Sequence, residues 1–250
     1  MGSRAVLVTG AGRGIGAAIA QAFAAEGDTV ALHHGRSAGL AAQVLASLPG
    51  DGHLLVQADL ADPAAVRRMV DQACGALGGL DVLVNNAGVY TPHRIGEVSY
   101  EDWQEAWTHT LGVNLLGAAN VTWCAVQHMI AAGNGGRIIN VSSRGAFRGE
   151  PGQPAYGASK AGLNALGQSL ARDLAPHGIA VTTVAPGFVA TDMAADSLSG
   201  PRGDEIRAQS PFHRVASTDE IAAAVTYLAS PEAEWASGAI LDLNGASYLR

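Results

Sequence analysis

A short apolar run, a glycine-rich turn and a predicted helix constrain the fold more than any other stretch of this chain. The run spans residues 5–9 and the helix residues 17–26, and Gly10-Ala-Gly-Arg-Gly-Ile-Gly16 lies between them. An apolar run of this length is typical of a buried parallel strand. Strand, glycine turn and helix N-terminus in that order form a cradle for the phosphates of a nucleotide. The residues predicted to line the cradle are Gly10, Gly12, Arg13, Gly14, Ile15 and Gly16.

Strand-like and helix-like segments alternate along the rest of the chain with short links, which requires a parallel sheet between layers of helices. The strands are expected at residues 5–9, 29–33, 53–57, 81–84, 137–141, 179–185 and 239–243. The helices are expected at residues 17–26, 40–48, 62–77, 100–132, 155–175 and 218–228. Because the sequence shows neither a repeat nor a linker, we expect residues 1–250 to form a single domain. Residues 191–212 are rich in Gly, Ser and Pro and are predicted to form a substrate lid.

Composition and charge exclude several classes of function. Hydrophobic residues make up 48% of the chain and charged residues 15%, which predicts a substantial core rather than a disordered chain. The net charge of −7 and the absence of a basic run argue against a nucleic-acid partner. Cys74 and Cys124 show no metal-ligand spacing and are interpreted as core thiols. With no apolar run as long as a membrane span and no signal-peptide pattern, we expect a cytoplasmic protein without a metal.

The end of the second predicted strand indicates which dinucleotide the chain prefers. Sites that bind NAD usually carry an acidic residue there, which holds the ribose hydroxyls. This chain has His33-His34-Gly35-Arg36-Ser37, without a carboxylate. The guanidinium groups of Arg36 and of Arg13 could both face a 2′-phosphate. We therefore predict NADP(H) rather than NAD(H), with Arg36 and Ser37 at the site; the alternative is that Arg36 is a solvated loop residue.

Tyr156 and Lys160 are four residues apart in a predicted helix and therefore share one of its faces. An ammonium near a phenol favours the phenolate and lowers a pKa that is ordinarily about 10, so such a tyrosine can exchange a proton near neutral pH. Ser143 ends the strand before this helix, where open α/β sheets place ligands. Alone, the Tyr–Lys pair is more often two amphipathic residues on a helix. Asn114, amid apolar neighbours, is ordinarily a buried amide that needs a hydrogen-bond partner.

Together these stretches resemble the single-domain branch of the short-chain dehydrogenase/reductase family. The residues that carry the resemblance are Thr9-Gly10-(x3)-Gly14-Ile15-Gly16, Asp59, Asn85-Asn86-Ala87-Gly88, Asn114, Ser143, Tyr156-(x3)-Lys160 and Pro186-Gly187. They span most of the chain in the order and spacing of the family. The resemblance implies a three-layer, doubly wound Rossmann fold with a seven-stranded parallel sheet. It also implies an enzyme that transfers hydride between NADP(H) and a ketone or secondary alcohol.

The resemblance implies a role for each matching residue. Tyr156 would be the general acid in reduction and the base in oxidation, and Ser143, rather than Ser142, would hold the substrate oxygen. Lys160 would lower the pKa of Tyr156 and bind the nicotinamide ribose, and Asn114 would support a water that leads to solvent. The further cofactor contacts implied are Tyr156 itself, Asp59, Leu60, Asn86, Ala87, Gly88, Pro186, Gly187, Val189 and Thr191.

The sequence leaves the substrate open. Similar proteins are often 3-oxoacyl-[acyl-carrier-protein] reductases, which usually place basic residues where this chain has Asn134 and His177. Neither is a fixed cation, so a general ketone or 3-oxoacyl-thioester reductase is the broader prediction. If Arg144 points inward it would bind a substrate carboxylate or phosphate. The favoured alternative is that Arg144 and Arg148 are solvated or pair with Glu150.

A non-catalytic NADP-sensing scaffold protein on the same fold is the alternative from another class. Such proteins should tolerate loss of the serine or the tyrosine, and all four catalytic-type residues are present here. Proteins of the family are usually homotetramers. The small residues Ala158, Ala161 and Gly162 on the predicted helix 155–175 are compatible with close packing in such an interface.

Overall fold

The computed structural model describes residues 2–250 and centres on one parallel sheet. The seven strands lie in the spatial order β3-β2-β1-β4-β5-β6-β7, and every adjacent pair is parallel. The strands are β1 (Ala5–Val8), β2 (Thr29–His34), β3 (Leu54–Gln57), β4 (Val82–Asn85), β5 (Gly136–Val141), β6 (Ile179–Pro186) and β7 (Ile240–Leu243). All seven predicted strands are present, which confirms the predicted sheet.

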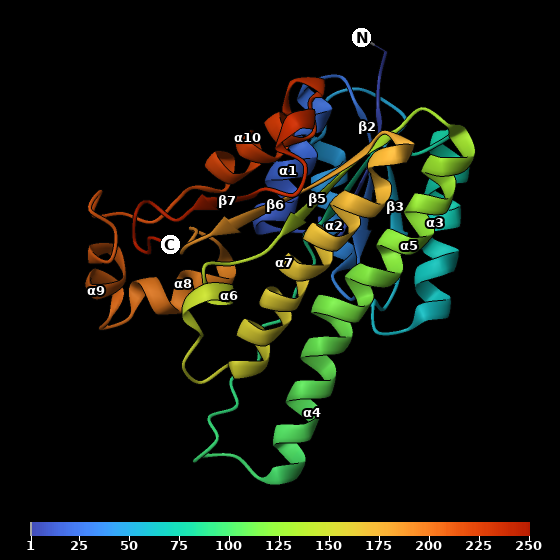
Figure 1. The fold of residues 1–250 in the computed structure, drawn as a ribbon. Helices are drawn as coiled ribbons and strands as arrows, with labels where there is room; N and C mark the ends of the chain where they lie inside the picture. Colours follow the sequence, from blue (N-terminus) through green and yellow to red (C-terminus); the bar gives the residue numbers. More distant parts are fainter. Residues whose placement is uncertain (1) are drawn as a thin grey trace.

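Helices cover both faces of the sheet and complete the three layers (Figure 1). Helices α1, α2 and α10 contribute to the apolar core on one face, and α3, α5 and α7 to the core on the other. The helical segments are α1 (Gly14–Ala25), α2 (Ala38–Ser47), α3 (Pro63–Leu77), α4 (Tyr100–Leu111), the π-helical η1 (Gly112–Gly117), α5 (Ala118–Ala132), α6 (Gly145–Arg148), α7 (Pro154–Leu174), η2 (Ala175–His177), α8 (Asp192–Ser199), α9 (Gly203–Ala208), α10 (Thr218–Leu228) and η3 (Pro231–Ala236).

Apolar side chains on both faces of the central strands explain why the sheet is buried. In β1, Val6 and Val8 belong to one core and Leu7 to the other, and all three are fully buried. The same alternation recurs in β4, where Leu83 faces away from its neighbours. Burying a side chain of this size stabilises the fold by about 1.5–3 kcal/mol. A strand that is apolar on both faces is stable only beneath two layers of helices.

The order of the strands determines where a ligand can bind. After β3 the chain crosses to the other side of β1, so that β1 lies between β2 and β4. Connections that leave adjacent strands toward opposite faces open a crevice beyond the carboxyl ends of those strands. The glycine turn begins there, directly after β1, and Gly10 adopts a positive φ of 66°. The fold is thus the doubly wound Rossmann arrangement that the sequence predicted.

Helix starts agree with the local sequence signals. Asp62 caps α3 by accepting hydrogen bonds from the backbone N–H groups of Ala64 and Ala65, and Pro63 is the first helical residue. Pro154 is likewise the first residue of α7. A proline suits this position because its fixed φ matches the helix and its missing N–H has no intrahelical partner there.

Two segments differ from the sequence prediction. The long helix expected at residues 100–132 is continuous in direction, but its middle turn is the π-helical η1, which contains Asn114. Residues 191–212 were expected to be irregular, yet they contain α8 and α9. Met, Ala and Leu in the first run and Glu, Arg and Ala in the second favour helix, and Gly200 and Pro201 separate the two runs. The lid itself remains a prediction.

The stretch Tyr100–Ala132 is long and apolar enough to cross a membrane by length and composition alone, although no single run of the sequence had suggested this. Within the fold, 44% of its most apolar window is buried, and α5 packs against α3. The stretch is therefore interpreted as a core helix.

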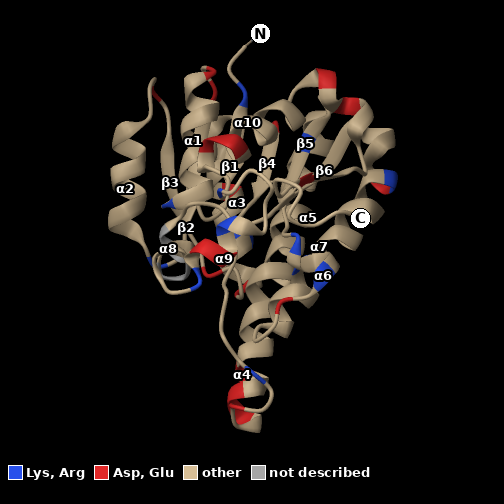
Figure 2. Ribbon diagram, turned by 90° about the vertical axis from the view of Figure 1, so that its left-hand side faces the viewer, with Lys and Arg blue, Asp and Glu red and all other residues tan. Residues whose placement is uncertain are grey.

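Acidic and basic positions are interspersed over the face seen in Figure 2.

Candidate active site

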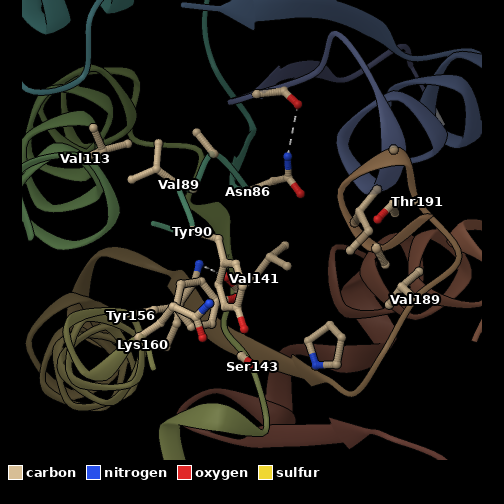
Figure 3. A pocket seen from close by; sticks show the side chains of 18 of the residues that line it. Asn86, Val89, Tyr90, Val113, Val141, Ser143, Tyr156, Lys160, Val189 and Thr191 are labelled. Carbon is tan, nitrogen blue, oxygen red and sulfur yellow. Dashed lines mark hydrogen bonds between the residues drawn. The ribbon is translucent and has the colours of Figure 1, made fainter. Parts of the chain in front are cut away.

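A cavity of about 930 Å³ opens at the carboxyl edge of the sheet, beside the glycine turn. Every residue that the sequence predicted to contact the cofactor lines this cavity, and so does Ser143. In Figure 3, Tyr90, Tyr156 and Lys160 group on one side with Ser143 close by, whereas Val189 and Thr191 lie across from them. Asn114 is the exception among the predicted site residues, because it lies behind the cavity wall.

The glycine turn is packed so tightly that side chains would close it. A Cβ atom at Gly16 would lie 2.3 Å from the Gly10 carbonyl oxygen, and one at Gly10 would lie 2.9 Å from Cα of Ala87. Among the described residues, no side chain caps the N-terminus of α1. The helix N–H groups and the positive end of its dipole therefore face the cavity, as a bound pyrophosphate requires.

Asn86 fixes the glycine turn from the neighbouring strand. Its side-chain Nδ2 donates hydrogen bonds to the carbonyl oxygens of Thr9 (2.8 Å) and Gly10 (3.2 Å). The Thr9 hydroxyl accepts in return from the backbone N–H groups of Asn86 and Ala87. These bonds join β1 to β4 at the crevice, so the cradle is held in place by the protein itself.

His33 holds the same turn from the side of β2. Its Nδ1 accepts a hydrogen bond from the backbone N–H of Gly10 at 3.1 Å, which leaves Nε2 to donate to the carbonyl oxygen of Ala58 at 3.1 Å. Burial lowers the pKa of His33 to about 4, so the ring is neutral at physiological pH as this arrangement needs. From the sequence, His33 was notable only because a carboxylate is missing at the end of this strand. Its contact with the glycine turn was not predicted.

Arg13 and Arg36 are exposed and line the cavity near the glycine turn and the end of β2. Ser37 and Asp59 line the same part. Two guanidinium groups are thus available at the place where a dinucleotide carries its adenosine ribose.

Tyr156 lies in the first turn of α7 with its ring against that of Tyr90. The ring centroids are 4.9 Å apart and the planes meet at 83°, an edge-to-face contact. Burial raises the pKa of Tyr156 to about 12, whereas a hydrogen bond with the Ser143 hydroxyl acts in the opposite direction. The carboxylate of Glu150 raises this pKa further. At neutral pH the phenol therefore carries its proton.

Lys160 lies one helical turn after Tyr156 and close to its ring. Its ammonium donates a hydrogen bond to the Val141 carbonyl oxygen at 2.8 Å and lies 5.8 Å from the centroid of the tyrosine ring. Burial lowers the pKa of Lys160 itself to about 8. At neutral pH Lys160 still carries its charge for most of the time, and Ser143 is the neighbouring group whose hydrogen bond acts to lower the pKa of Tyr156. That Lys160 lowers this pKa stays a prediction.

Asn114 has the hydrogen-bond partners that its burial requires. Its Oδ1 accepts from the backbone N–H of Val89 at 2.8 Å, and its Nδ2 donates to the Val89 carbonyl oxygen and to the Ser159 hydroxyl. A Cβ atom at Gly88 would lie 3.5 Å from both Asn114 Oδ1 and Lys160 Nζ, so Asn114 lies directly behind two residues that line the cavity. Asn114 therefore joins the chain after β4 to helix α7.

His93 does not line the cavity but supports the helix of Tyr156, and the sequence analysis missed it. It is buried, its Nδ1 donates to the Thr91 carbonyl oxygen at 2.7 Å, and its Nε2 therefore accepts from the backbone N–H of Ala155 at 3.2 Å. Ala155 precedes Tyr156 in the first turn of α7, whose N–H groups have no partners within the helix. No local pattern in the sequence predicts this cap, because His93 and Ala155 are 62 residues apart.

The cap predicts that His93→Phe destabilises the protein. Phenylalanine retains the edge contact with Trp103, at 5.4 Å between centroids, but cannot accept from Ala155. We expect the free energy of unfolding to fall by about 1–2 kcal/mol. The measurement is denaturant unfolding at neutral pH, with His93→Gln as the control because its amide oxygen can still accept. Equal stabilities of His93→Phe and the unchanged protein would show that the cap has no energetic role.

Arg144 points inward, contrary to the favoured expectation that it is solvated or paired with Glu150. It is 4% exposed, and its Nη atoms donate hydrogen bonds to the Ser247 hydroxyl and to the Gln209 side-chain oxygen. Arg148 is exposed, in agreement with the expectation that it is solvated. Both arginines line the cavity.

Comparison with known proteins agrees with this geometry. The family model described as short chain dehydrogenase matches residues 4–201. The chain is 36% identical over 249 residues to the 3-oxoacyl-[acyl-carrier-protein] reductase of Staphylococcus aureus, with 99% of both proteins covered. It is 39% identical over 242 residues to nodulation protein G of Rhizobium meliloti, covering 97% of this chain and 96% of that one.

Solved structures with the same fold include a short chain dehydrogenase from Burkholderia cenocepacia in complex with NADP. It is 38% identical, has a TM-score of 0.89, and 98% of each chain is covered. A dehydrogenase/reductase from Sinorhizobium meliloti is 34% identical with a TM-score of 0.90, covering 100% of this chain and 96% of that chain.

Proposed function

The chain belongs to the short-chain dehydrogenase family of oxidoreductase enzymes, and we propose that it uses NADP(H) to interconvert a ketone and a secondary alcohol. The observation that carries the proposal is that one cavity contains both the glycine cradle and the trio of Ser143, Tyr156 and Lys160. A binding protein of the same fold would need the cradle alone. The trio at its end therefore favours an enzyme over an NADP-sensing scaffold.

The residues of the trio have distinct roles in this proposal. A nicotinamide bound along the cavity would supply hydride to the carbonyl carbon. Negative charge then develops on the substrate oxygen, where the hydroxyls of Ser143 and Tyr156 donate hydrogen bonds. Because Tyr156 has a pKa of about 12, it is protonated at neutral pH and passes its proton to that oxygen. Lys160 orients the cofactor and offsets the charge left on the phenol.

A panel of ketones tests this function. Purified protein is mixed with NADPH and each ketone, and oxidation of the dinucleotide is followed by absorbance. The proposal expects turnover with at least one ketone and the loss of that turnover in Tyr156→Phe. Activity that is unchanged in this variant would remove Tyr156 from the mechanism.

We propose NADP(H) as the preferred dinucleotide because the cavity presents Arg13 and Arg36 and no carboxylate at the end of β2. The Burkholderia cenocepacia relative, solved with NADP, is consistent with this preference. A guanidinium forms charge-assisted hydrogen bonds with a phosphate, which NAD(H) lacks at the 2′ position.

Removing these arginines should affect one dinucleotide only. We expect Arg36→Ala and Arg13→Ala each to raise the KM for NADPH by about tenfold, because a charged hydrogen bond contributes about 1.5 kcal/mol, and to leave the KM for NADH within about twofold. The measurement is steady-state kinetics with both dinucleotides. Arg68→Ala is the control, since Arg68 is exposed on α3 outside the cavity. Parallel increases for both dinucleotides would contradict a role in selecting the 2′-phosphate.

A 3-oxoacyl group on a carrier protein is a second candidate substrate, because the Staphylococcus aureus relative carries that name. The exposed positions where related reductases usually carry basic residues are Asn134 and His177, and neither is a fixed cation. A general 3-oxoacyl thioester therefore remains the broader proposal. Comparing kcat/KM for the same 3-oxoacyl group on a carrier and on a short thiol tests it; a strong preference for the carrier would favour the narrower function.

We also propose that the protein acts as a homotetramer in the cytoplasm, as members of its family usually do. Exposed apolar residues on the outer face of the central helices, Leu116 and Trp123, are consistent with an interface there. Size-exclusion chromatography with light scattering tests the assembly, and a monomer would contradict it.

A further inference from the structure

Arg144 is a buried cation surrounded by neutral groups. The residue directly follows Ser143, and its guanidinium contacts the Ser247 hydroxyl, the Gln209 side-chain oxygen at 2.6 Å and the Phe188 ring at 5.0 Å. A guanidinium has five N–H donors, and these two hydrogen bonds use two of them. Among the side chains that the structure describes, none with a carboxylate is within ion-pair distance of Arg144. Burial without a counter-charge is unfavourable, so a function must explain it.

The position of Arg144 points to the substrate. Arg144 lines the cavity that contains Ser143 and Tyr156, as do its contacts Phe188 and Gln209. Its third contact, Ser247, lines a smaller neighbouring cavity that Arg144 also borders. Glu150 is the nearby acidic residue that acts on Arg144, and it does so at longer range without an ion pair. The donors of Arg144 that have no partner among the described residues can therefore reach a ligand in the part of the cavity near Ser143 and Tyr156.

The charge around the part of the cavity near Ser143 and Tyr156 is opposite in sign to the net charge of the whole protein. Its lining includes Arg94, Arg148 and Arg202, all exposed, together with buried Arg144, and the facing acidic residues are Glu150 and Glu205. Helix α6, which ends at Arg148, is a basic segment in Figure 2. The chain as a whole has a net charge of −7. A cationic cavity in an acidic protein attracts anions and directs them inward.

We propose that the substrate is an oxo acid, a ketone whose carboxylate binds the Arg144 guanidinium while its carbonyl oxygen faces Ser143 and Tyr156. The inference rests on the proposed ketone reduction and specifies its substrate class. A carboxylate matches the site because it is planar, accepts two parallel N–H donors and carries the single charge that one guanidinium balances. A phosphate dianion would need a second cation beside this guanidinium, and the other arginines of this part of the cavity are exposed.

Matched pairs of substrates isolate the carboxylate. The kcat/KM with NADPH is measured for 2-oxo, 3-oxo and 4-oxo acids and for their methyl esters, in the unchanged protein and in Arg144→Met. The unchanged protein should prefer the acid for at least one chain length. In Arg144→Met we expect kcat/KM for that acid to fall about 100-fold and for its ester to change less than about fivefold, the loss expected for one charged hydrogen-bonded pair. Arg144→Lys should recover part of the loss for the acid.

Two further variants separate the charge from its surroundings. The double variant Ser247→Ala/Gln209→Ala removes both hydrogen bonds of Arg144 and keeps its charge, so it should retain the preference for the acid. Arg148→Met removes an equal charge from an exposed position of the same cavity and should lower kcat/KM for the acid only a few-fold. As a readout independent of turnover, the oxo acid should raise the Tm of the unchanged protein bound to NADP⁺, with which it cannot react, and not that of Arg144→Met.

The outcomes are distinguishable. Equal losses on acid and ester in Arg144→Met would show that Arg144 only fastens the chain around Gln209 and Ser247, and would overturn the proposal. Reduction of the esters but not of the acids by the unchanged protein would overturn it too, while leaving ketone reduction in place. Failure to reduce any acid or ester of the series, or any ketone of the neutral panel, would overturn the proposed function and this inference with it.

Discussion

Tyr156→Phe is expected to lower kcat for ketone reduction by about 10³-fold or more, since proton transfer by a positioned side chain contributes about 10²–10⁴-fold and the substrate oxygen also loses a hydrogen bond. The substitution keeps the ring and its edge contact with Tyr90, 4.9 Å away, so the cavity should keep its shape. The dissociation constant for NADPH is therefore expected to change less than about twofold, because the phenol hydroxyl is not among the groups that face the phosphates.

Tyr90→Phe is the matched control for this prediction. Tyr90 lines the same cavity and its pKa is also raised by burial, so the control removes a second phenol from the same cavity. We expect kcat in Tyr90→Phe to fall less than about tenfold, since no proton transfer depends on that hydroxyl. If Tyr156→Phe retained more than a tenth of the original kcat, or if the two variants lost equal activity, Tyr156 would not be the proton donor.

Lys160→Met is expected to give a protein that is more stable and nearly inactive. Burial lowers the pKa of Lys160 from 10.5 to about 8, a difference worth about 3 kcal/mol against the folded state at neutral pH. Methionine removes this cost but leaves the Val141 carbonyl oxygen without its donor, which costs about 1–2 kcal/mol. The net gain in the free energy of unfolding is therefore about 1–2 kcal/mol, whereas kcat/KM should fall about 100-fold because the cofactor loses its alignment.

The gain in stability should depend on pH in a definite direction. Because the pKa of Lys160 is lower in the folded protein than in the unfolded chain, the unfolded chain binds more protons between pH 8 and 10.5. The cost of the buried lysine is therefore present in full below about pH 8 and disappears as the pH rises toward 10.5. The difference in unfolding free energy between Lys160→Met and the unchanged protein should shrink over that interval.

Denaturant unfolding of both proteins from pH 7 to pH 10 measures this difference directly. Taking the difference between the two proteins removes the groups that titrate in both, such as Tyr156 and Cys74, whose pKa values burial raises. A difference that stays constant or grows with pH would mean that the lysine is not a buried cation with a lowered pKa. A less stable Lys160→Met variant at pH 7 would mean that the bond to Val141 outweighs the cost of burial.

Much of the fold could be predicted from the sequence because the signals are local. Apolar runs such as residues 5–9 are too short for helices and too apolar for surface strands, and their alternation with helices permits one kind of sheet. The glycine turn could be located because its neighbours in the chain, a strand and a helix, are what make it a phosphate cradle. Pro154 and Asp62 marked helix starts for equally local reasons.

The parts of the site that could not be predicted depend on contacts between distant segments. His93 caps the helix of Tyr156 from the loop after β4. His33, in β2, holds the glycine turn that follows the neighbouring strand β1. Whether the pKa of Tyr156 is raised or lowered depends on how deeply the phenol is buried, which the spacing of Tyr156 and Lys160 in the sequence does not determine. Arg144 is buried because its guanidinium bonds to Gln209 and Ser247, which lie far from it in the sequence.

The most direct test of the account is the transfer of deuterium from NADPH labelled at C4 of the nicotinamide, one face at a time, to a ketone that the protein reduces. Mass spectrometry of the alcohol reports where the label goes. The account predicts one deuterium on the carbinol carbon from one of the two labelled forms, and about 10³-fold less labelled product from Tyr156→Phe over the same time. An alcohol that carries no deuterium from either form would contradict direct hydride transfer in this cavity.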